Sequence, residues 1–205
     1  MNKEPLTIAL PKGRLFEQVQ EYFNTKGLNF KFEKRKLISY DEEGLLKIYL
    51  VKNSDLPAYV NAGIAGLGVC GDDVVYESGL DFYKLRSFDF GGTRLAMAAL
   101  KEREEEARTR ELTIATSYPA MTRDYFHEQG ISVNIIKLKG SVELAPSLGL
   151  APYIVDLVET GSTLKANGLE VVQDLMNIKV RMIANRSYFK LNYDRINDLL
   201  ERIGD

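Results

Sequence analysis

Runs of apolar residues along the chain predict a series of short β-strands. Most of these runs are followed by glycine, proline or a charged residue, and the runs recur at residues 6–10, 45–51, 67–70, 95–100, 112–116, 131–138 and 178–183. Between several of them the apolar residues follow helical spacing, as at 15–23 and in the closing segment 193–203. Strands that alternate with helices through most of the length indicate the α/β class with largely parallel sheets.

Two stretches interrupt this alternation. Residues 82–90 are mixed in character, and the Gly91-Gly92 pair that follows is the best hinge candidate in the chain. Residues 101–111, KEREEEARTRE, are a charge run that predicts a solvated helix or loop. We find no internal repeat and no low-complexity segment.

Composition narrows the class of protein. The chain has 205 residues, of which 45% are hydrophobic and 27% charged, as expected for a soluble globular protein. A net charge of −2 argues against a nucleic-acid binder held by phosphate contacts. The single cysteine, Cys70, excludes an internal disulfide and a Cys-rich zinc site. Without a signal-peptide pattern or an apolar run of membrane-spanning length, we expect a cytoplasmic protein.

Residues 151–164, APYIVDLVETGSTL, carry the strongest chemical signal. A β-type run leads into Asp156, and a turn of small hydroxylated residues around Gly161 precedes helix formers. Such a turn suits a phosphate, because glycine allows close approach and backbone N–H groups and hydroxyls point at the anion. Asp156 and Glu159 repel a phosphate and therefore need another task, such as accepting hydrogen bonds from sugar hydroxyls. An ordinary helix cap by Thr160 or Ser162 explains the same residues, so both interpretations stay open.

Other motifs are weaker. Lys12-Gly13-Arg14 forms a turn between a predicted strand and helix, which suits an anion but also fits solvated charges. Residues 66–71, GLGVCG, satisfy the dinucleotide pattern G-x-G-x-x-G, but they follow a helix and contain the strand themselves, so we reject a Rossmann site. Asp72 or Asp73 then caps a helix at 74–77. His127, the only histidine, fits a surface or capping role near a helix end.

Taken together, these motifs resemble the ATP phosphoribosyltransferase family. The resemblance rests on residues 10–15 (LPKGRL), 143–146 (ELAP), 148–151 (LGLA) and the 151–164 stretch, and it extends from about residue 6 to 203. The length resembles the short form, which implies a hetero-oligomer with a regulatory subunit similar to a histidyl-tRNA synthetase. The resemblance also implies two α/β domains around a cleft, of the periplasmic-binding-protein type II. Domain one would comprise residues 1–92 plus about 180–205, and domain two residues 93–179.

The resemblance implies a set of site residues. Those expected to bind phosphoribosyl pyrophosphate (PRPP) are Asp156, Glu159, Thr160, Gly161, Ser162, Thr163 and Leu164. Those expected near ATP or pyrophosphate are Lys12, Gly13, Arg14, Arg35, Lys52, Asp72, Arg94 and Glu143. Mg²⁺ is the implied cofactor, held mainly by substrate phosphates. The chain departs from the usual family pattern at Lys52, Ser117 and Pro152, which affects the cations that meet the phosphates.

The implied reaction is attack of adenine N1 on C1 of the ribose, as the first step of histidine biosynthesis. It needs no protein nucleophile, which agrees with a chain that has no Ser-His-Asp or Cys-His arrangement. Two alternatives remain: a solute-binding protein, which shares the implied fold, and a phosphoribosyltransferase that uses a nucleobase. The latter class begins its loop with two adjacent acids, whereas Val155 precedes Asp156 here.

Overall fold

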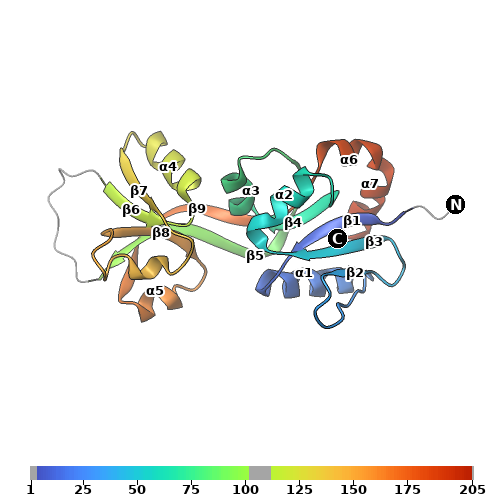
Figure 1. Ribbon diagram of the computed structural model, residues 1–205, viewed down its shortest axis with the longest axis horizontal. Helices are drawn as coiled ribbons and strands as arrows, with labels where there is room; N and C mark the ends of the chain where they lie inside the picture. Colours follow the sequence, from blue (N-terminus) through green and yellow to red (C-terminus); the bar gives the residue numbers. More distant parts are fainter. Residues whose placement is uncertain (1–3, 102–111, 205) are drawn as a thin grey trace. The chain divides into compact units, whose positions relative to one another are not determined.

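The computed structural model describes residues 4–101 and 112–204, and the chain divides into two compact units (Figure 1). Unit 1 consists of Met1–Gly91 and Lys179–Asp205, and unit 2 of Gly92–Ile178. The charge run expected to form a solvated helix or loop lies outside the described residues from position 102 onward. No helix in the described ranges is long and apolar enough to cross a membrane.

Unit 1 is built on a mixed sheet in the order β2-β3-β1-β4-β9. The central strand β1 (Leu6–Pro11) pairs in parallel with β3 (Leu46–Val51) and with β4 (Leu67–Gly71). The strands β2 (Ile38–Tyr40) and β9 (Leu169–Ala184) run antiparallel to their neighbours β3 and β4, and β5 (Tyr83–Leu100) lies on the other side of β9. Because β1, β3 and β4 are parallel, they end at one edge, which we call the carboxyl edge of unit 1.

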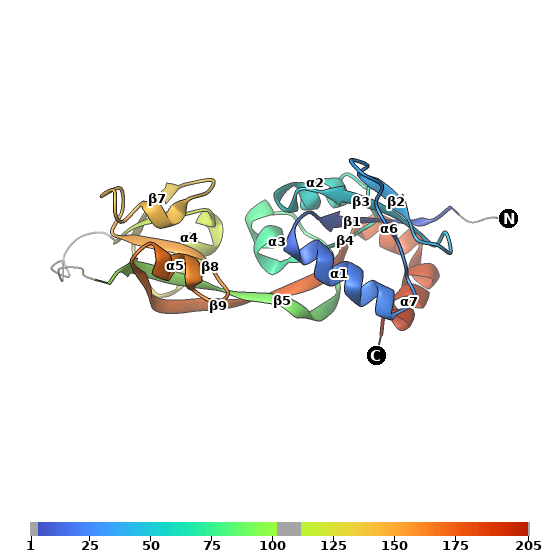
Figure 2. The ribbon, with the colours of Figure 1, turned by 90° about the horizontal axis from the view of Figure 1, so that it is seen from below.

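Helices cover both faces of this sheet (Figure 2). On one face α1 (Arg14–Thr25) and α7 (Tyr193–Arg202) bury Phe23 and Ile196 against Ile8 of β1. On the other face the side chains come from α2 (Leu56–Asn61), which follows the 3-10 turn η1 (Asn53–Asp55), and from α3 (Asp72–Ser78). The strands and helices predicted for this unit are present, but α3 begins at Asp72 after the cap residue Gly71, so the prediction that Asp72 or Asp73 caps this helix was wrong. A further helix, α6 (Arg186–Leu191), was not predicted, and it is capped by Asn185, whose side chain accepts from the N–H groups of Ser187 and Tyr188.

Unit 2 repeats the same plan on a smaller scale. The central strand β6 (Leu112–Thr116) lies parallel to β7 (Val133–Lys137) and β8 (Tyr153–Val158). The strand β5 (Tyr83–Leu100) pairs antiparallel with β8 through residues 94–99. Since β6, β7 and β8 are parallel, their last residues mark the carboxyl edge of unit 2.

The two faces of the unit 2 sheet are covered by different short elements. The helix α4 (Pro119–Glu128) packs Met121 and Phe126 onto the face that carries Ile114 and Val155. The opposite face carries Ala96, Ile154 and Val158, and it is covered by η2 (Val142–Leu144) and α5 (Ser162–Ala166). We call these the α4 face and the α5 face.

The two long strands differ from the prediction. Residues 83–90, from the stretch that had no clear assignment, form with residues 91–100 one continuous strand of 18 residues, β5. The 16-residue strand β9 likewise extends far beyond the predicted 178–183. Each of these strands contributes residues to both units. Gly91 and Gly92 lie inside β5 at the boundary of the units, and their role as a hinge stays a prediction.

The glycine-rich segment at 66–71 serves packing. Residues 67–71 are the strand β4 itself, so the rejection of a dinucleotide loop is confirmed. A Cβ on Gly66 would lie 2.0 Å from the Tyr188 ring, and one on Gly68 would lie 2.7 Å from the Leu56 side chain. These glycines are required because neighbouring side chains occupy the space that a Cβ needs.

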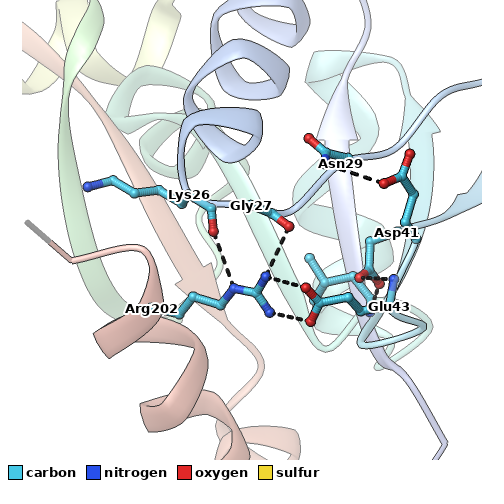
Figure 3. Close-up of polar contacts among 8 residues, drawn as sticks. Lys26, Gly27, Asn29, Asp41, Glu43 and Arg202 are labelled. Carbon is cyan, nitrogen blue, oxygen red and sulfur yellow. Dashed lines mark hydrogen bonds and ion pairs between the residues drawn. The ribbon is translucent and has the colours of Figure 1, made fainter.

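Arg202, at the end of α7, ties the C-terminal helix to two turns of unit 1 (Figure 3). Its Nη1 and Nη2 each donate to one carboxylate oxygen of Glu43 at 2.7 Å, in the turn between β2 and β3. Nη2 also donates to the carbonyl of Gly27 at 2.9 Å, and Nε to that of Lys26 at 3.3 Å. This bond pattern lowers the pKa of Glu43 and raises that of Arg202, in both cases mainly through their mutual hydrogen bonds.

Candidate active site

The loop that follows β8 lies at the carboxyl edge of unit 2, beside the end of β6. Thr116, the last residue of β6, is aligned with Val155 of β8. The chain after β6 therefore turns away at Ser117 next to Asp156, and the chain after β8 continues through Glu159 into α5. In parallel sheets ligands bind at this edge, because the loops that leave the strands meet there.

The turn before α5 has an exposed polar surface. Gly161 is the residue that precedes the helix, with φ 74° and ψ 8°, a left-handed conformation that favours glycine. Glu159, Thr160, Ser162 and Thr163 are exposed. The Thr160 hydroxyl donates to Ser162 Oγ at 3.1 Å and accepts weakly from the Ser162 N–H at 3.4 Å. The simple capping interpretation is weakened, because neither Thr160 nor Ser162 is the cap residue and Gly161 has no side chain to cap with.

Leu164 differs from the rest of this set. Its side chain is buried among the apolar residues of the α5 face. Only its backbone N–H is left to contact a ligand, since the first N–H groups of a helix have no carbonyl partner within it.

Asp156 lies inside β8, two residues before the strand ends, and not at its end as the apolar run alone indicated. Its Oδ1 accepts from the Leu157 N–H at 2.8 Å. Burial raises the pKa of Asp156, the Leu157 N–H lowers it, and repulsion by Glu143 raises it further. Glu143 belongs to η2, which covers the α5 face. Two carboxylates from different elements thus face one region, where hydroxyl donors or a cation relieve their repulsion.

Arg94 lies on β5, the strand beside β8, close to the end of β8. It is paired with Val158, the last residue of β8, so it stands beside the start of the loop. Its Nε lies 2.6 Å from Oδ1 of Asp174 in β9. Because both side chains are well exposed, this ion pair contributes little to stability.

Several predicted cations of unit 1 gather at its own carboxyl edge. Pro11 and Val51, the last residues of β1 and β3, are register partners, and the Lys12 N–H donates to the Val51 carbonyl at 2.8 Å. Lys12 and Lys52 therefore leave adjacent strands side by side, and both are exposed. Arg14, also exposed, begins α1 directly after this turn. Gly13 is approachable, since no atom lies within 4 Å of the place a Cβ would take.

Arg35 approaches the same edge from the loop before β2. The Leu37 carbonyl accepts from the Leu50 N–H, one residue before β3 ends. Arg35, two residues earlier, is exposed and has a left-handed φ of 66°, an uncommon conformation for a residue with a side chain.

Asp72 follows β4 at this edge, but its carboxylate is already paired. Arg181 Nε donates to its two oxygens at 2.6 and 2.8 Å, and Lys84 Nζ lies 3.7 Å away. The neighbouring Asp73 is buried, and burial raises its pKa. A role of Asp72 toward a ligand stays a prediction, since the structure gives this carboxylate a partner within unit 1.

Thr116 is a buried polar residue of this edge that no sequence pattern indicated. This residue is fully buried at the end of β6, and its hydroxyl bonds to β8 and to the following turn. A threonine before Ser-Tyr-Pro looks like an ordinary strand end, so only the cross-strand contact identifies it.

The described residues offer little for nucleophilic or metal-centred chemistry. Among residues 4–101 and 112–204, no three His, Cys, Asp or Glu side chains are grouped so as to hold a metal. Cys70 is buried, and burial raises its thiol pKa, which makes it a poor nucleophile. His127 is exposed near the end of α4, as predicted for a surface role. The arrangement suits the positioning of anionic, hydroxylated substrates.

Comparison with known proteins identifies relatives over almost the whole length. Residues 52–205 match the HisG family model, described as ATP phosphoribosyltransferase. The chain is 43% identical to the ATP phosphoribosyltransferase of Clostridioides difficile, with 95% of each chain covered. It is 41% identical to that of Aquifex aeolicus, with 97% of this chain and 93% of the relative covered.

Solved structures agree with the α/β architecture. The chain matches the ATP phosphoribosyl transferase (HisG:HisZ) complex from Thermotoga maritima with a TM-score of 0.82 and 33% identity, covering 97% of this chain and 96% of that one. It also matches the alkanesulfonate-binding protein SsuA from Xanthomonas axonopodis with a TM-score of 0.62 and 12% identity, covering 99% and 73%. The second likeness concerns the fold alone, and it confirms the expected periplasmic-binding-protein type of α/β architecture.

Proposed function

This chain belongs to the ATP phosphoribosyltransferase family, and we propose that it transfers the 5-phosphoribosyl group of PRPP to N1 of ATP with release of pyrophosphate. The observation that carries the proposal is identity of about 40% to named relatives over nearly the full length. The family name supports a pentosyl-transferring enzyme of histidine biosynthesis. The specific reaction and the residues that perform it are the proposal.

In this proposal the carboxyl edge of unit 2 binds PRPP. The exposed hydroxyls and backbone N–H groups from Thr160 to Leu164 hold the 5′-phosphate. Asp156 and Glu159 accept from the ribose hydroxyls. The raised pKa of Asp156 supports this role, because hydroxyl donors satisfy a carboxylate that the protein leaves poorly solvated. Glu143 acts beside it, near the ribose or the adenine.

The cations of unit 1 are proposed to meet the phosphates of ATP and pyrophosphate. Lys12, Arg14, Arg35 and Lys52 lie toward one edge of the unit 1 sheet, and Gly13 lets the backbone come close. Arg94 is the candidate from unit 2, once it exchanges Asp174 for a phosphate. Asp72 serves this edge indirectly through its pairs with Arg181 and Lys84.

The residues present also fit a magnesium ion held mainly by the substrates. Mg²⁺ in such sites uses one or two carboxylates together with substrate phosphates, and Asp156 and Glu143 supply that number. When bound, the ion neutralises charge on the departing pyrophosphate. No larger cluster of protein ligands is needed.

The chemistry requires position rather than a covalent intermediate. Adenine N1 attacks C1 of the ribose while the bond to pyrophosphate breaks, so positive charge develops on the sugar. The protein holds both substrates and places carboxylates near that charge. Asp156 is the residue best placed for this in unit 2, because it is fixed in a strand and bonded to the Leu157 N–H.

A partner subunit is part of the proposal. The Thermotoga maritima structure is a HisG:HisZ complex, and our chain covers 96% of the matched chain. We therefore propose a hetero-oligomer with a histidyl-tRNA-synthetase-like regulatory subunit, located in the cytoplasm with the other enzymes of amino-acid biosynthesis. No observation favours the alternatives of a solute-binding protein or a nucleobase-specific transferase.

Pyrophosphate release tests the proposal. The chain is mixed with ATP, PRPP and Mg²⁺, with and without the candidate regulatory subunit, and pyrophosphate is followed. We expect release that requires both substrates, and a product with the ribose on adenine N1. A folded chain that releases no pyrophosphate in either mixture contradicts the proposal, and replacement of ATP by adenine or hypoxanthine checks the acceptor.

A further inference from the structure

Thr116 links the end of β6 to the middle of β8 and to the residue that follows β7. It is the last residue of β6 and fully buried. Its hydroxyl donates to the Val155 carbonyl of β8 at 2.7 Å and accepts from the Tyr118 N–H at 2.9 Å. Its own carbonyl accepts from the N–H of Leu138, directly after β7, at 2.9 Å.

These bonds fix the residues on either side of Thr116. Thr116 and Val155 are register partners, so their side chains share the α4 face. Successive side chains in a strand point to opposite faces, and Asp156 therefore points to the α5 face, toward Glu143. Ser117, which follows Thr116, begins the turn beside Asp156. The Thr116 hydroxyl thus fixes how far along β8 the Asp156 carboxylate lies relative to this turn.

We propose that Thr116 is a positioning residue of the phosphoribosyl site, which holds Asp156 and the Ser117-Tyr118 turn in register across the carboxyl edge of unit 2. The inference rests on the proposed function, because it takes Asp156 to bind the ribose. A valine at position 116 fills nearly the same volume, but it removes the hydroxyl that accepts from the part-buried Tyr118 N–H and donates to the Val155 carbonyl. The turn then loses its side-chain link to β8, while the backbone ladder between β6 and β8 stays in place.

Thr122 provides a matched control. It is equally buried, and its hydroxyl donates to the Tyr118 carbonyl at 2.7 Å. That carbonyl also accepts from the Thr122 N–H at 3.0 Å. Loss of the Thr122 hydroxyl therefore removes a threonine side-chain hydrogen bond to the same turn without removing the side-chain bond between β6 and β8.

The test compares PRPP affinity among variants of the full chain. Dissociation constants for PRPP with Mg²⁺ are measured by calorimetry for Thr116→Val, Thr116→Ser and Thr122→Val, with the regulatory subunit present if the wild type requires it. We expect Thr116→Val to weaken binding by about tenfold or more, since small misplacements of binding groups are costly. Thr116→Ser restores affinity to within about twofold, and Thr122→Val leaves it unchanged although both valine variants unfold at lower temperature.

Equal PRPP affinity of the two valine variants overturns the inference, because Thr116 is then only a stabilising residue. If Thr116→Val does not fold, Thr116→Cys replaces it, since a thiol is a weaker donor. PRPP affinity that decreases from the wild type through Thr116→Ser to Thr116→Cys supports the inference, and equal affinity of the three proteins overturns it. If the wild-type chain binds PRPP, the proposed PRPP site stands, and the comparison of variants then tests the role of Thr116 alone. A wild-type chain that binds none overturns both.

Discussion

Gly161 is the residue at which local conformation most directly decides ligand binding. Its φ of 74° is open to glycine and costs a residue with a side chain roughly 1–2 kcal/mol. Space is not the obstacle, because a Cβ would lie 3.8 Å from Val158, an ordinary contact. A substitution there changes the direction of the N–H groups that we assign to the 5′-phosphate, while the core stays packed.

We predict that Gly161→Val weakens PRPP binding by about tenfold or more and leaves a folded protein. Gly168 supplies the control, because it lies beyond the other end of α5, has φ 72°, and has no atom within 4 Å of a Cβ. Gly168→Val imposes a similar backbone strain outside the loop. Calorimetric titration of both variants checks the prediction, and equal affinities would show that the turn merely starts a helix.

Asp156 is expected to reduce stability in exchange for function. Burial and Glu143 raise its pKa above that of the unfolded chain. For a group with a raised folded pKa, stability is greatest below the unfolded pKa and decreases as pH rises through the folded pKa. At neutral pH the ionised carboxylate therefore destabilises unit 2.

We predict that Asp156→Asn raises the thermal midpoint at pH 7 by about 2 °C, since the amide has no charge to desolvate. The gain shrinks as pH falls through the folded pKa of Asp156 and disappears below the unfolded value of about 3.9, where the wild-type carboxyl is protonated in both states. The rate of pyrophosphate release by Asp156→Asn is expected to be lower than that of the wild type by roughly 100-fold or more, because the amide does not stabilise positive charge on the ribose. Melting curves from pH 4 to 8, together with activity, check both parts. A lower midpoint at pH 7 would be the contrary result.

At the scale of elements, the attachment of α7 depends on Arg202 more than on any exposed ion pair nearby. Its hydrogen bonds reach the Lys26 and Gly27 carbonyls as well as Glu43, whereas Arg186 of α6 pairs with the exposed Asp81. We predict that Arg202→Ala lowers the free energy of unfolding of unit 1 by about 1–2 kcal/mol through the lost carbonyl bonds. Arg186→Ala is the control, and chemical denaturation compares the two.

The Glu43 contribution to this attachment has a defined pH dependence. The pKa of Glu43 is lowered in the folded state, mainly by the hydrogen bond from Arg202. Its contribution is present above the unfolded pKa of about 4.3 and is lost as pH falls through the folded value. The difference between wild type and Glu43→Gln should therefore vanish in acid. A difference that persists at low pH would mean that the amide fails for steric reasons.

The strands and helices with clear periodicity were predictable, and the long strands were not. α1 and α7 have one apolar stripe each, and β1, β3, β4 and β6 are short apolar runs with distinct ends, so local sequence defines them. The part of β5 before Gly91 has no continuous apolar run, because its residues are in part exposed and in part buried. Its identity as a strand comes from pairing with other segments, which no local window contains.

At the scale of the whole molecule, the chain returns to unit 1 after completing unit 2. β5 leads out of unit 1 and β9 leads back, and the last helices pack on the first strand. This arrangement explains why residues far apart in sequence meet within a unit, as when Arg202 meets Glu43 or Arg181 meets Asp72. Neither pair has a sequence signature, since each is one of many opposite charges in a chain that is 27% charged.

The sequence by itself determined the α/β class, the family resemblance and the position of the β8–α5 loop, because these depend on periodicity and on a contiguous motif. Only the tertiary structure decided which of the proposed residues share an edge. It brought Lys12 beside Lys52, engaged Asp72 with Arg181, buried Leu164 and set Asp156 against Glu143. It also showed Thr116 bonded across to β8. These facts arise from strand order and register, which bring together positions that the sequence separates by tens of residues.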